Sequence, residues 1–116
     1  MDPKRLSRFK KTLQTRRREL RRSIAETQHA GRTIQQAYGP DEGDRANSSH
    51  DKELLFHRST HARGLLQAVE AALSRISEGT FGNCLRCGEE INTKRLEAVP
   101  STRYYLTCQE LLEGKD

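Results

Sequence analysis

The sequence predicts a mainly α-helical protein: a long antiparallel helical hairpin, then a small cysteine-containing module with a short terminal helix. Apolar residues recur at helical spacing over about 38 residues before, and about 33 residues after, a short acidic segment rich in glycine and proline. The 116-residue chain is only 33% hydrophobic and has no tryptophan, which is little for a globular core. We therefore predict a hairpin at residues 1–78 and a second module at residues 79–116.

The acidic segment at residues 39–46 separates the two predicted helices and reads Gly-Pro-Asp-Glu-Gly-Asp-Arg-Ala. Neither helix is expected to cross its two glycines and its proline. Asp41 and Asp44 are both preferred N-cap residues, so either could open the second helix. At a rise of about 1.5 Å per residue each arm is on the order of 50 Å long, which makes this segment an acidic tip far from the second module.

Both predicted helices carry an imperfect seven-residue repeat, which is typical of a coiled-coil seam. Gly39-Pro40 argues against one continuous helix, so we favour a hairpin within a monomer over a parallel dimer. In the first helix the repeat consists of Leu6, Leu13, Leu20, Thr27 and Ile34. In the second helix, predicted at about residues 44–77, it consists of Leu55, Ala62, Val69 and Ile76, with Leu65 and Ala72 as a second column.

The charge of the chain is unevenly distributed. Residues 1–38 carry 11 Lys and Arg residues against three acidic residues, a net charge of +8, whereas residues 39–116 carry 10 against 13, a net charge of −3. The basic first helix is either a solvated face or a docking surface for an acidic partner, protein or nucleic acid.

His57 and His61 lie four residues apart and so share one face of the second helix, one turn after Glu53. A helical His-x-x-x-His can bind zinc, but the hydrolytic motif needs Glu directly after the first histidine, where this chain has Arg58. We interpret the pair as either solvated histidines or histidines at the edge of the seam.

Three cysteines point to metal or redox chemistry in the second module, which makes it zinc-finger-like. Cys84, Cys87 and the following Gly88 have the spacing of a zinc knuckle, in which two thiolates face one point. A complete site needs a second Cys-x-x-Cys about 15–20 residues further on. The chain supplies Cys108, but Tyr105 stands at the other position, and a phenol is a poor zinc ligand at neutral pH.

Three interpretations of the cysteines remain open. One is a three-thiolate zinc site completed by water or an outside ligand, and another is a metal-free finger. The third, a redox Cys-x-x-Cys, ranks last because no βαβ pattern surrounds it. The metal-free finger would be packed around Phe81, Ile91, Leu96, Val99, Tyr105 and Leu106.

The cysteine usage, together with the absence of a signal peptide or an apolar membrane span, predicts a cytoplasmic protein.

The tip and the finger together resemble the DksA/TraR family, whose members are bacterial transcription regulators that bind RNA polymerase. Asp41, Asp44 and Ala46 match its Asp-x-x-Asp-x-Ala tip motif, and the resemblance covers about residues 35–112 directly. In the finger, the matching residues are Gly79, Phe81, Gly82, Cys84, Cys87, Gly88, Glu90, Ile91, Arg95, Leu96, Ala98 and Pro100.

The resemblance implies a non-enzymatic regulator of transcription initiation that does not bind specific DNA sequences. The globular base, at the end of the hairpin opposite the tip, would dock on the polymerase rim. The hairpin would enter the secondary channel and bring Asp41, Asp44 and Ala46 close to the catalytic centre. Carboxylates there can act on Mg²⁺ or on cationic side chains near a phosphoryl-transfer site.

Two departures from the family pattern change what is expected. Tyr105 replaces a family cysteine, so zinc would be held by Cys84, Cys87 and Cys108, or the finger would be metal-free. In members that respond to the alarmone ppGpp, basic residues contact its phosphates, and the equivalent positions here are Ala68, Val99 and Gln109. The loss of these charge-assisted contacts predicts weak or absent synergy with ppGpp.

The alternative function is a small nucleic-acid-binding module, with the basic first helix on phosphates and the finger as a recognition knuckle. Such binding would fall steeply with salt. Glu89, Glu90 and Glu97 in the finger, together with the acidic tip, would repel a polyanion, and few aromatic residues are available to stack on bases.

Overall fold

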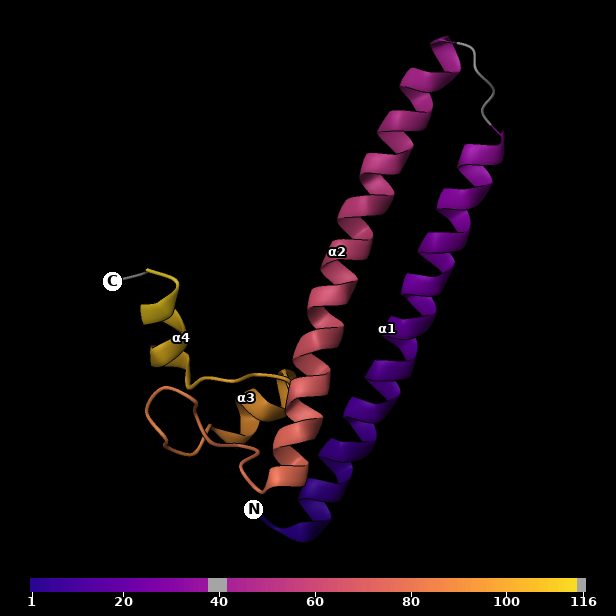
Figure 1. The fold of residues 1–116 in the computed structure, drawn as a ribbon. Coiled ribbons are helices and arrows are strands. Elements are labelled where there is room, and N and C mark those ends of the chain that lie inside the picture. Colours follow the sequence, from indigo (N-terminus) through magenta and orange to yellow (C-terminus); the bar gives the residue numbers. More distant parts are fainter. Residues whose placement is uncertain (38–41, 115–116) are drawn as a thin grey trace. The chain divides into compact units, whose positions relative to one another are not determined.

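The computed structural model describes residues 1–37 and 42–114, and it describes side chains for residues 1–33 and 50–114. Its helices are α1 (Pro3–Ala37), α2 (Glu42–Glu78), α3 (Thr93–Ala98) and α4 (Leu106–Leu112) (Figure 1). The described residues contain no β-strand, although Asn83 and Glu90 form an isolated antiparallel bridge. The predicted fold class is confirmed: two long helices precede a small finger module that ends in a short helix.

The chain divides into two compact units, and each unit contains part of both long helices. We call Arg18–Leu66 the hairpin unit, and Met1–Arg17 together with Gln67–Asp116 the finger unit. This division follows the packing of the chain. The boundary that we place between residues 78 and 79 instead separates the helices from the cysteine-containing segment, and it stays a prediction.

In the hairpin unit the two long helices pack through small and β-branched side chains. Ile24 and Thr27 of α1 and Ala62 of α2 are buried. A Cβ atom on Gly31 would lie 3.9 Å from Cδ1 of Leu55, so the end of α1 contacts the first half of α2, as antiparallel pairing requires. The hydroxyl of Thr27 donates a hydrogen bond of 2.8 Å to the backbone carbonyl one turn earlier, which allows this polar side chain to be buried.

The finger unit has the larger aromatic core. The ring of Phe9 on α1 lies 5.4 Å from that of Phe81, centroid to centroid, at a tilt of 52°. Leu13 and Leu96 are the largest fully buried side chains, with 1% and 2% of their surface exposed. Phe81 and Leu96 lie in residues 79–114, which we call the finger segment, so burial of apolar surface joins this segment to α1. Further buried residues of this core are Val69, Ala72 and Ile91.

The seven-residue repeat predicts much of this seam, with one error. The repeat residues that are buried are Leu13, Thr27, Ala62 and Val69, whereas Leu6, Leu20, Leu55 and Ile76 are half-buried. The side chain of Ile34 lies outside the described part. In the second column Ala72 is buried, but the prediction was wrong for Leu65, which is exposed.

The sequence predicts the end of α2 more closely than its beginning. α2 begins at Glu42, so Asp44 lies in its first turn and does not precede the helix as an N-cap would. Asp41 lies outside the described residues, and only the backbone of Asp44 and Ala46 is described. At the other end Gly79 follows the helix with a φ of +81°, a backbone conformation that favours glycine.

Arg75 of α2 is a buried cation whose Nη2 atom has no hydrogen-bond partner among the described residues. Burial lowers the pKa of its guanidinium, nearby Arg103 lowers it further, and Glu78 and Tyr104 oppose the shift. We expect Arg75→Met to raise the free energy of unfolding by about 1 kcal/mol, because methionine keeps part of the stem and removes a buried charge. Urea unfolding followed by circular dichroism measures the change. A clear loss of stability would show that the guanidinium stabilises the finger unit.

No helix in the described part of the chain is both long enough and apolar enough to cross a bilayer.

Candidate metal centre

The finger segment folds through a few backbone hydrogen bonds that bring distant residues together. The Ile91 N–H donates to the Gly82 carbonyl at 2.7 Å, which closes the loop that contains Cys84 and Cys87. The Leu85 N–H donates to the Arg103 carbonyl at 2.9 Å. This last bond ties the loop to the segment that leads into α4, the helix that carries Cys108.

The structure brings the three predicted cysteines together. Their Sγ atoms all lie within 4.8 Å of one another, and the described residues contain no other such cluster of three or more histidine, cysteine or acidic side chains. Cys84 and Cys108 are buried, whereas Cys87 is exposed. Gly88 has a φ of +78° and donates its N–H to the Cys84 carbonyl at 2.9 Å, which closes the tight turn of a knuckle.

The backbone around Cys84 favours its thiolate. Burial raises the pKa of this thiol, but hydrogen bonds from the backbone N–H groups of Cys87, Tyr105 and Arg86 outweigh burial and bring the pKa to about 6. For Cys87 the backbone N–H of Glu89 favours the thiolate, yet the neighbouring sulfurs of Cys84 and Cys108, together with burial, raise its pKa overall.

This donor set fits a soft cation such as Zn²⁺. With Zn–S bonds of about 2.3 Å, the sulfurs of a tetrahedral site lie about 3.8 Å apart, which the observed cluster can reach with small shifts. Nη1 of Arg86 lies 3.8 Å from the Cys108 sulfur and donates to it, so one cation offsets part of the negative charge that three thiolates would carry. Three sulfurs leave the fourth tetrahedral position to another ligand.

Tyr105 contributes to this site through its backbone. It precedes α4 as the N-cap residue, with φ −59° and ψ 150°, and its N–H reaches the Cys84 sulfur. Tyr105 also lines a groove between α3 and α4 with Val99 and Leu106. We expected all three to help form the finger core, and that prediction was wrong because all three are exposed. Phe81, Ile91 and Leu96 are buried as predicted.

The pKa of Cys84 predicts how the stability of the metal-free, reduced protein depends on pH. Its value of about 6 in the folded state is below the ordinary thiol value of 9.0, so folding favours the thiolate. The resulting stabilisation is fully present above pH 9.0, shrinks as the pH falls, and is lost below about 6. Urea unfolding across this range should therefore show stability rising with pH. Cys84→Ser should abolish that part of the rise, and an unchanged slope would contradict the low pKa.

His57 and His61 of α2 do not join a larger cluster of metal-ligand side chains among the described residues. His57 and His61 are both exposed, and the ring of His57 meets Phe56 edge-on at 5.9 Å. The described residues place no third histidine, cysteine or acidic ligand with them.

Two long helices followed by a cysteine-containing finger define a class of protein that comparison with known families identifies. Residues 79–114 match the prokaryotic dksA/traR C4-type zinc finger, and residues 5–76 match the N-terminal domain of the DnaK suppressor protein DksA. The chain therefore belongs to the DksA/TraR family.

Individual relatives agree with this assignment. The RNA polymerase-binding transcription factor DksA of Salmonella typhimurium is 32% identical over 116 residues, which cover all of this chain and 76% of that protein. The DksA of Haemophilus influenzae is 35% identical over 77 residues, or 66% of this chain and 53% of that protein. The match to an uncharacterised protein of Aquifex aeolicus likewise spans only 48% of its length. The structure of transcription factor DksA2 from Pseudomonas aeruginosa superposes with a TM-score of 0.87 at 25% identity, covering 98% of this chain and 87% of that one.

Sequence reasoning missed several features of the finger unit. The helix α3 was not predicted, although Asn92 is a preferred N-cap residue and its side chain accepts a hydrogen bond of 2.9 Å from the Lys94 N–H. The burial of Phe9 was also missed. Its spacing from Leu6 and Leu13, at i, i+3 and i+7, is the signal that could have revealed it.

Proposed function

We propose that this protein is a non-enzymatic transcription regulator that binds bacterial RNA polymerase. The observation that carries the proposal is the similarity of the entire chain to relatives named RNA polymerase-binding transcription factors, at 32% identity for the Salmonella typhimurium protein. The similarity extends to the fold, because the DksA2 structure superposes over 98% of this chain.

In the proposed mechanism, the hairpin enters the secondary channel of the polymerase and the finger unit remains at its rim. Asp41, Asp44 and Ala46 are the residues that we propose act on the polymerase. The carboxylates would be presented next to the beginning of α2, where they can attract Mg²⁺ or a cationic side chain of the catalytic centre. Regulation then follows from a change in the stability of the initiation complex.

We further propose that Cys84, Cys87 and Cys108 hold a zinc ion. When bound, zinc would crosslink the knuckle to α4 and leave one coordination position to water or an outside ligand. The three sulfurs within 4.8 Å, the low pKa of Cys84 and the Arg86 guanidinium all support this site. Because Cys87 is exposed, the ion would exchange more readily than in a closed four-cysteine site.

Weak or absent synergy with ppGpp remains our expectation. Ala68, Val99 and Gln109 line one pocket of the finger unit, and none of them carries a charge. Arg95 and Arg103 line it too, but the Nε of Arg95 donates to the Tyr104 carbonyl at 3.1 Å and the guanidinium of Arg103 lies 5.5 Å from the centre of the Tyr104 ring. Tight, saturable binding of ppGpp to the complex of this protein with polymerase would contradict the expectation.

Transcription from purified components tests the proposal. The protein should change the lifetime of open promoter complexes formed by bacterial RNA polymerase, without binding the promoter DNA in the absence of polymerase. If the protein instead binds DNA alone, with an affinity that falls steeply between about 50 and 200 mM salt, the nucleic-acid-binding alternative applies. No effect on any promoter complex at a saturating protein concentration would contradict regulation of initiation.

A further inference from the structure

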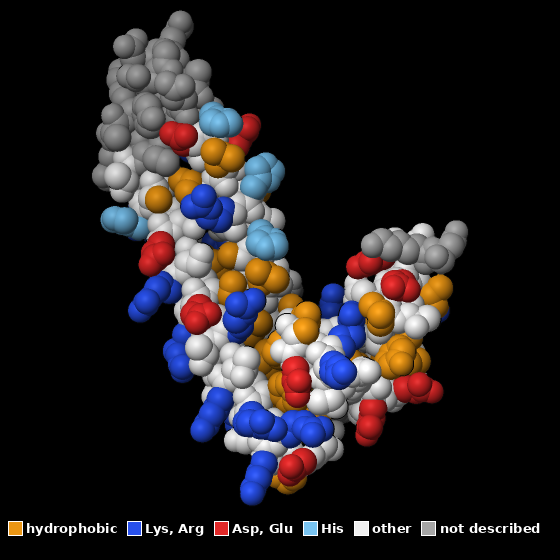
Figure 2. Space-filling model, turned by 180° about the vertical axis from the view of Figure 1, so that it is seen from behind, with side chains coloured by type: hydrophobic (Ala, Val, Ile, Leu, Met, Phe, Trp, Pro, Cys, Tyr) orange, Lys and Arg blue, Asp and Glu red, His pale blue; other side chains and the backbone are white. Residues whose placement is uncertain are grey.

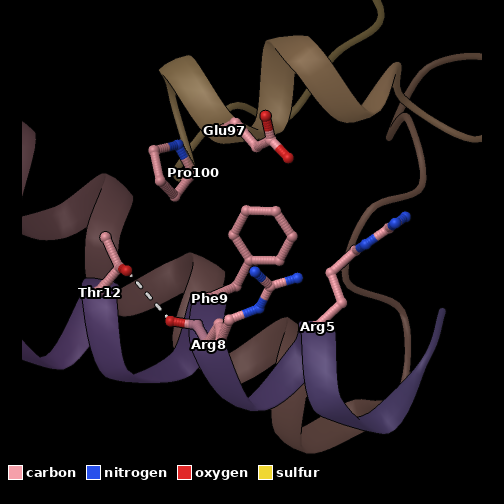
Figure 3. A pocket seen from close by; sticks show the side chains of 6 residues that line it. All are labelled: Arg5, Arg8, Phe9, Thr12, Glu97 and Pro100. Atoms are coloured by element: carbon pink, nitrogen blue, oxygen red, sulfur yellow. Dashed lines mark hydrogen bonds between the residues drawn. The ribbon is translucent and has the colours of Figure 1, made fainter.

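A small cleft lies in the finger unit between the first turns of α1 and the end of α3. It has a volume of about 250 Å³ and is lined by Arg5, Arg8, Phe9, Thr12, Glu97 and Pro100. Figure 3 shows the α1 residues on one side of the cleft and Glu97 and Pro100 on the other, with the Phe9 ring between them. We refer to it as the Arg5–Arg8 cleft.

The floor of this cleft is apolar and held in place. Phe9 is buried and packs against Phe81, so its ring is fixed by the core of the finger unit. Pro100 adds a second rigid apolar surface on the opposite wall. Thr12 adds little hydrogen-bonding capacity as a donor, because its hydroxyl already donates to the Arg8 carbonyl at 3.1 Å (Figure 3).

The charged groups at the rim of this cleft are unpaired within the described part of the chain. Among the described residues, neither the Arg5 nor the Arg8 guanidinium forms a hydrogen bond or an ion pair, and Glu97 across the cleft has no such partner either. Arg5 and Arg8 are three residues apart on α1 and therefore share one face of the helix. Lys and Arg side chains also crowd the surface where α1 begins, at the lower end of Figure 2, so the local field attracts an anion.

We propose that the Arg5–Arg8 cleft binds an acidic peptide segment of a protein partner that carries an apolar side chain beside its carboxylates. A guanidinium presents a planar fork that matches a carboxylate, and two of them on one face can hold two acidic side chains. The apolar side chain packs on Phe9 and Pro100. This surface is separate from the tip residues, and the proposal does not depend on the identity of the partner.

Two features favour a peptide over a nucleic acid. The cleft is small and fits one or two side chains. Its lining by Phe9 and Pro100 offers apolar contact, which a phosphate backbone cannot use.

The test is a titration of the full chain with a blocked hexapeptide, Glu-Glu-Leu-Glu-Glu-Leu, followed by two-dimensional NMR. The largest shifts should fall on the backbone amides of Arg5, Arg8, Phe9, Thr12 and Glu97. The uncharged peptide Gln-Gln-Leu-Gln-Gln-Leu should bind roughly tenfold more weakly or not at all, because it lacks charge-assisted hydrogen bonds.

Matched variants locate the site. The double variant Arg5→Ala/Arg8→Ala should weaken peptide binding by roughly tenfold or more. Lys10→Ala/Lys11→Ala removes the same charge from exposed positions of α1 outside the cleft and should change affinity by less than about twofold. Glu97→Gln should strengthen binding by about twofold, because it removes a repelling carboxylate.

Either of two results would overturn the proposal. One is equal loss of affinity in the two double variants, which would mean that only the net charge of α1 attracts the peptide. The other is tighter binding of a single-stranded dT oligonucleotide at the same amides, which would assign the cleft to nucleic acid. Thermal unfolding of each variant checks that it is folded. The titration contains no polymerase, so its outcome is independent of the proposed function.

Discussion

Replacing Tyr105 by cysteine will raise the affinity for zinc by at least about 100-fold. Removing a group that only holds a metal ligand in position typically lowers metal affinity 10–100-fold, and a direct ligand contributes more than such a group. The backbone N–H of Tyr105 already reaches the Cys84 sulfur, so a cysteine at this position lies within reach of the cluster. The variant would complete a four-thiolate site, which is the closed arrangement of structural zinc. Competition with a chromophoric chelator measures the affinity of the variant and of the unchanged protein.

Leu106→Cys is the matched control for this substitution. It adds the same thiol one residue further on, where the Cys-x-x-Cys spacing to Cys108 is lost, and it should leave zinc affinity unchanged. Equal tightening in both variants would show that any additional thiol suffices. No tightening in Tyr105→Cys would contradict the placement of residue 105 at the fourth ligand position.

Replacing Asp44 by asparagine is expected to abolish the effect on transcription while changing stability by less than about 1 kcal/mol. Asp44 lies in the first turn of α2, where a carboxylate interacts favourably with the helix dipole, and asparagine forfeits only that modest interaction. The proposed action on the polymerase depends on the negative charge, which asparagine lacks. The measurements are the lifetime of open promoter complexes and the urea unfolding of the variant.

Glu53→Gln is a suitable control because it removes one negative charge from an exposed position further along α2. It should retain full regulation. If Asp44→Asn also retains full regulation, the carboxylate of Asp44 has only a structural role at the beginning of the helix.

The sequence predicts the fold well where a repeat or a breaker residue carries the signal. The seven-residue repeat identifies Leu13, Thr27, Ala62 and Val69 as buried residues of the paired helices, and Gly79 marks the end of α2. The spacing of Cys84 and Cys87 indicates a knuckle whose two thiolates face one point, and the structure shows that the Cys108 sulfur lies with them.

What the sequence does not reveal depends on contacts between distant segments. The spacing of Phe9 along its helix could indicate burial, but no local pattern reveals that its partner is Phe81, which lies far along the chain. Arg75 is buried although its charge suggests exposure. In the short segment around α3 and α4, too few residues define a periodicity, so the exposed faces of Val99 and Leu106 could not be told from buried ones.

The Arg5–Arg8 cleft could be found only in the structure. The sequence shows a basic first helix and leaves open whether its charges are merely solvated. The structure adds Glu97 and Pro100 from the end of α3, which convert one face of that helix into a cleft of defined size.

The most direct measurement of the proposed function is competition for purified bacterial core RNA polymerase between this protein and an established secondary-channel factor. We predict saturable binding and mutual displacement. Because we propose that Asp44 acts after docking, the Asp44→Asn variant should displace the factor as well as the unchanged protein does. Simultaneous binding of both proteins would contradict insertion of the hairpin into the channel. Failure to bind the polymerase at all, with zinc present and at moderate salt, would contradict the proposed function itself.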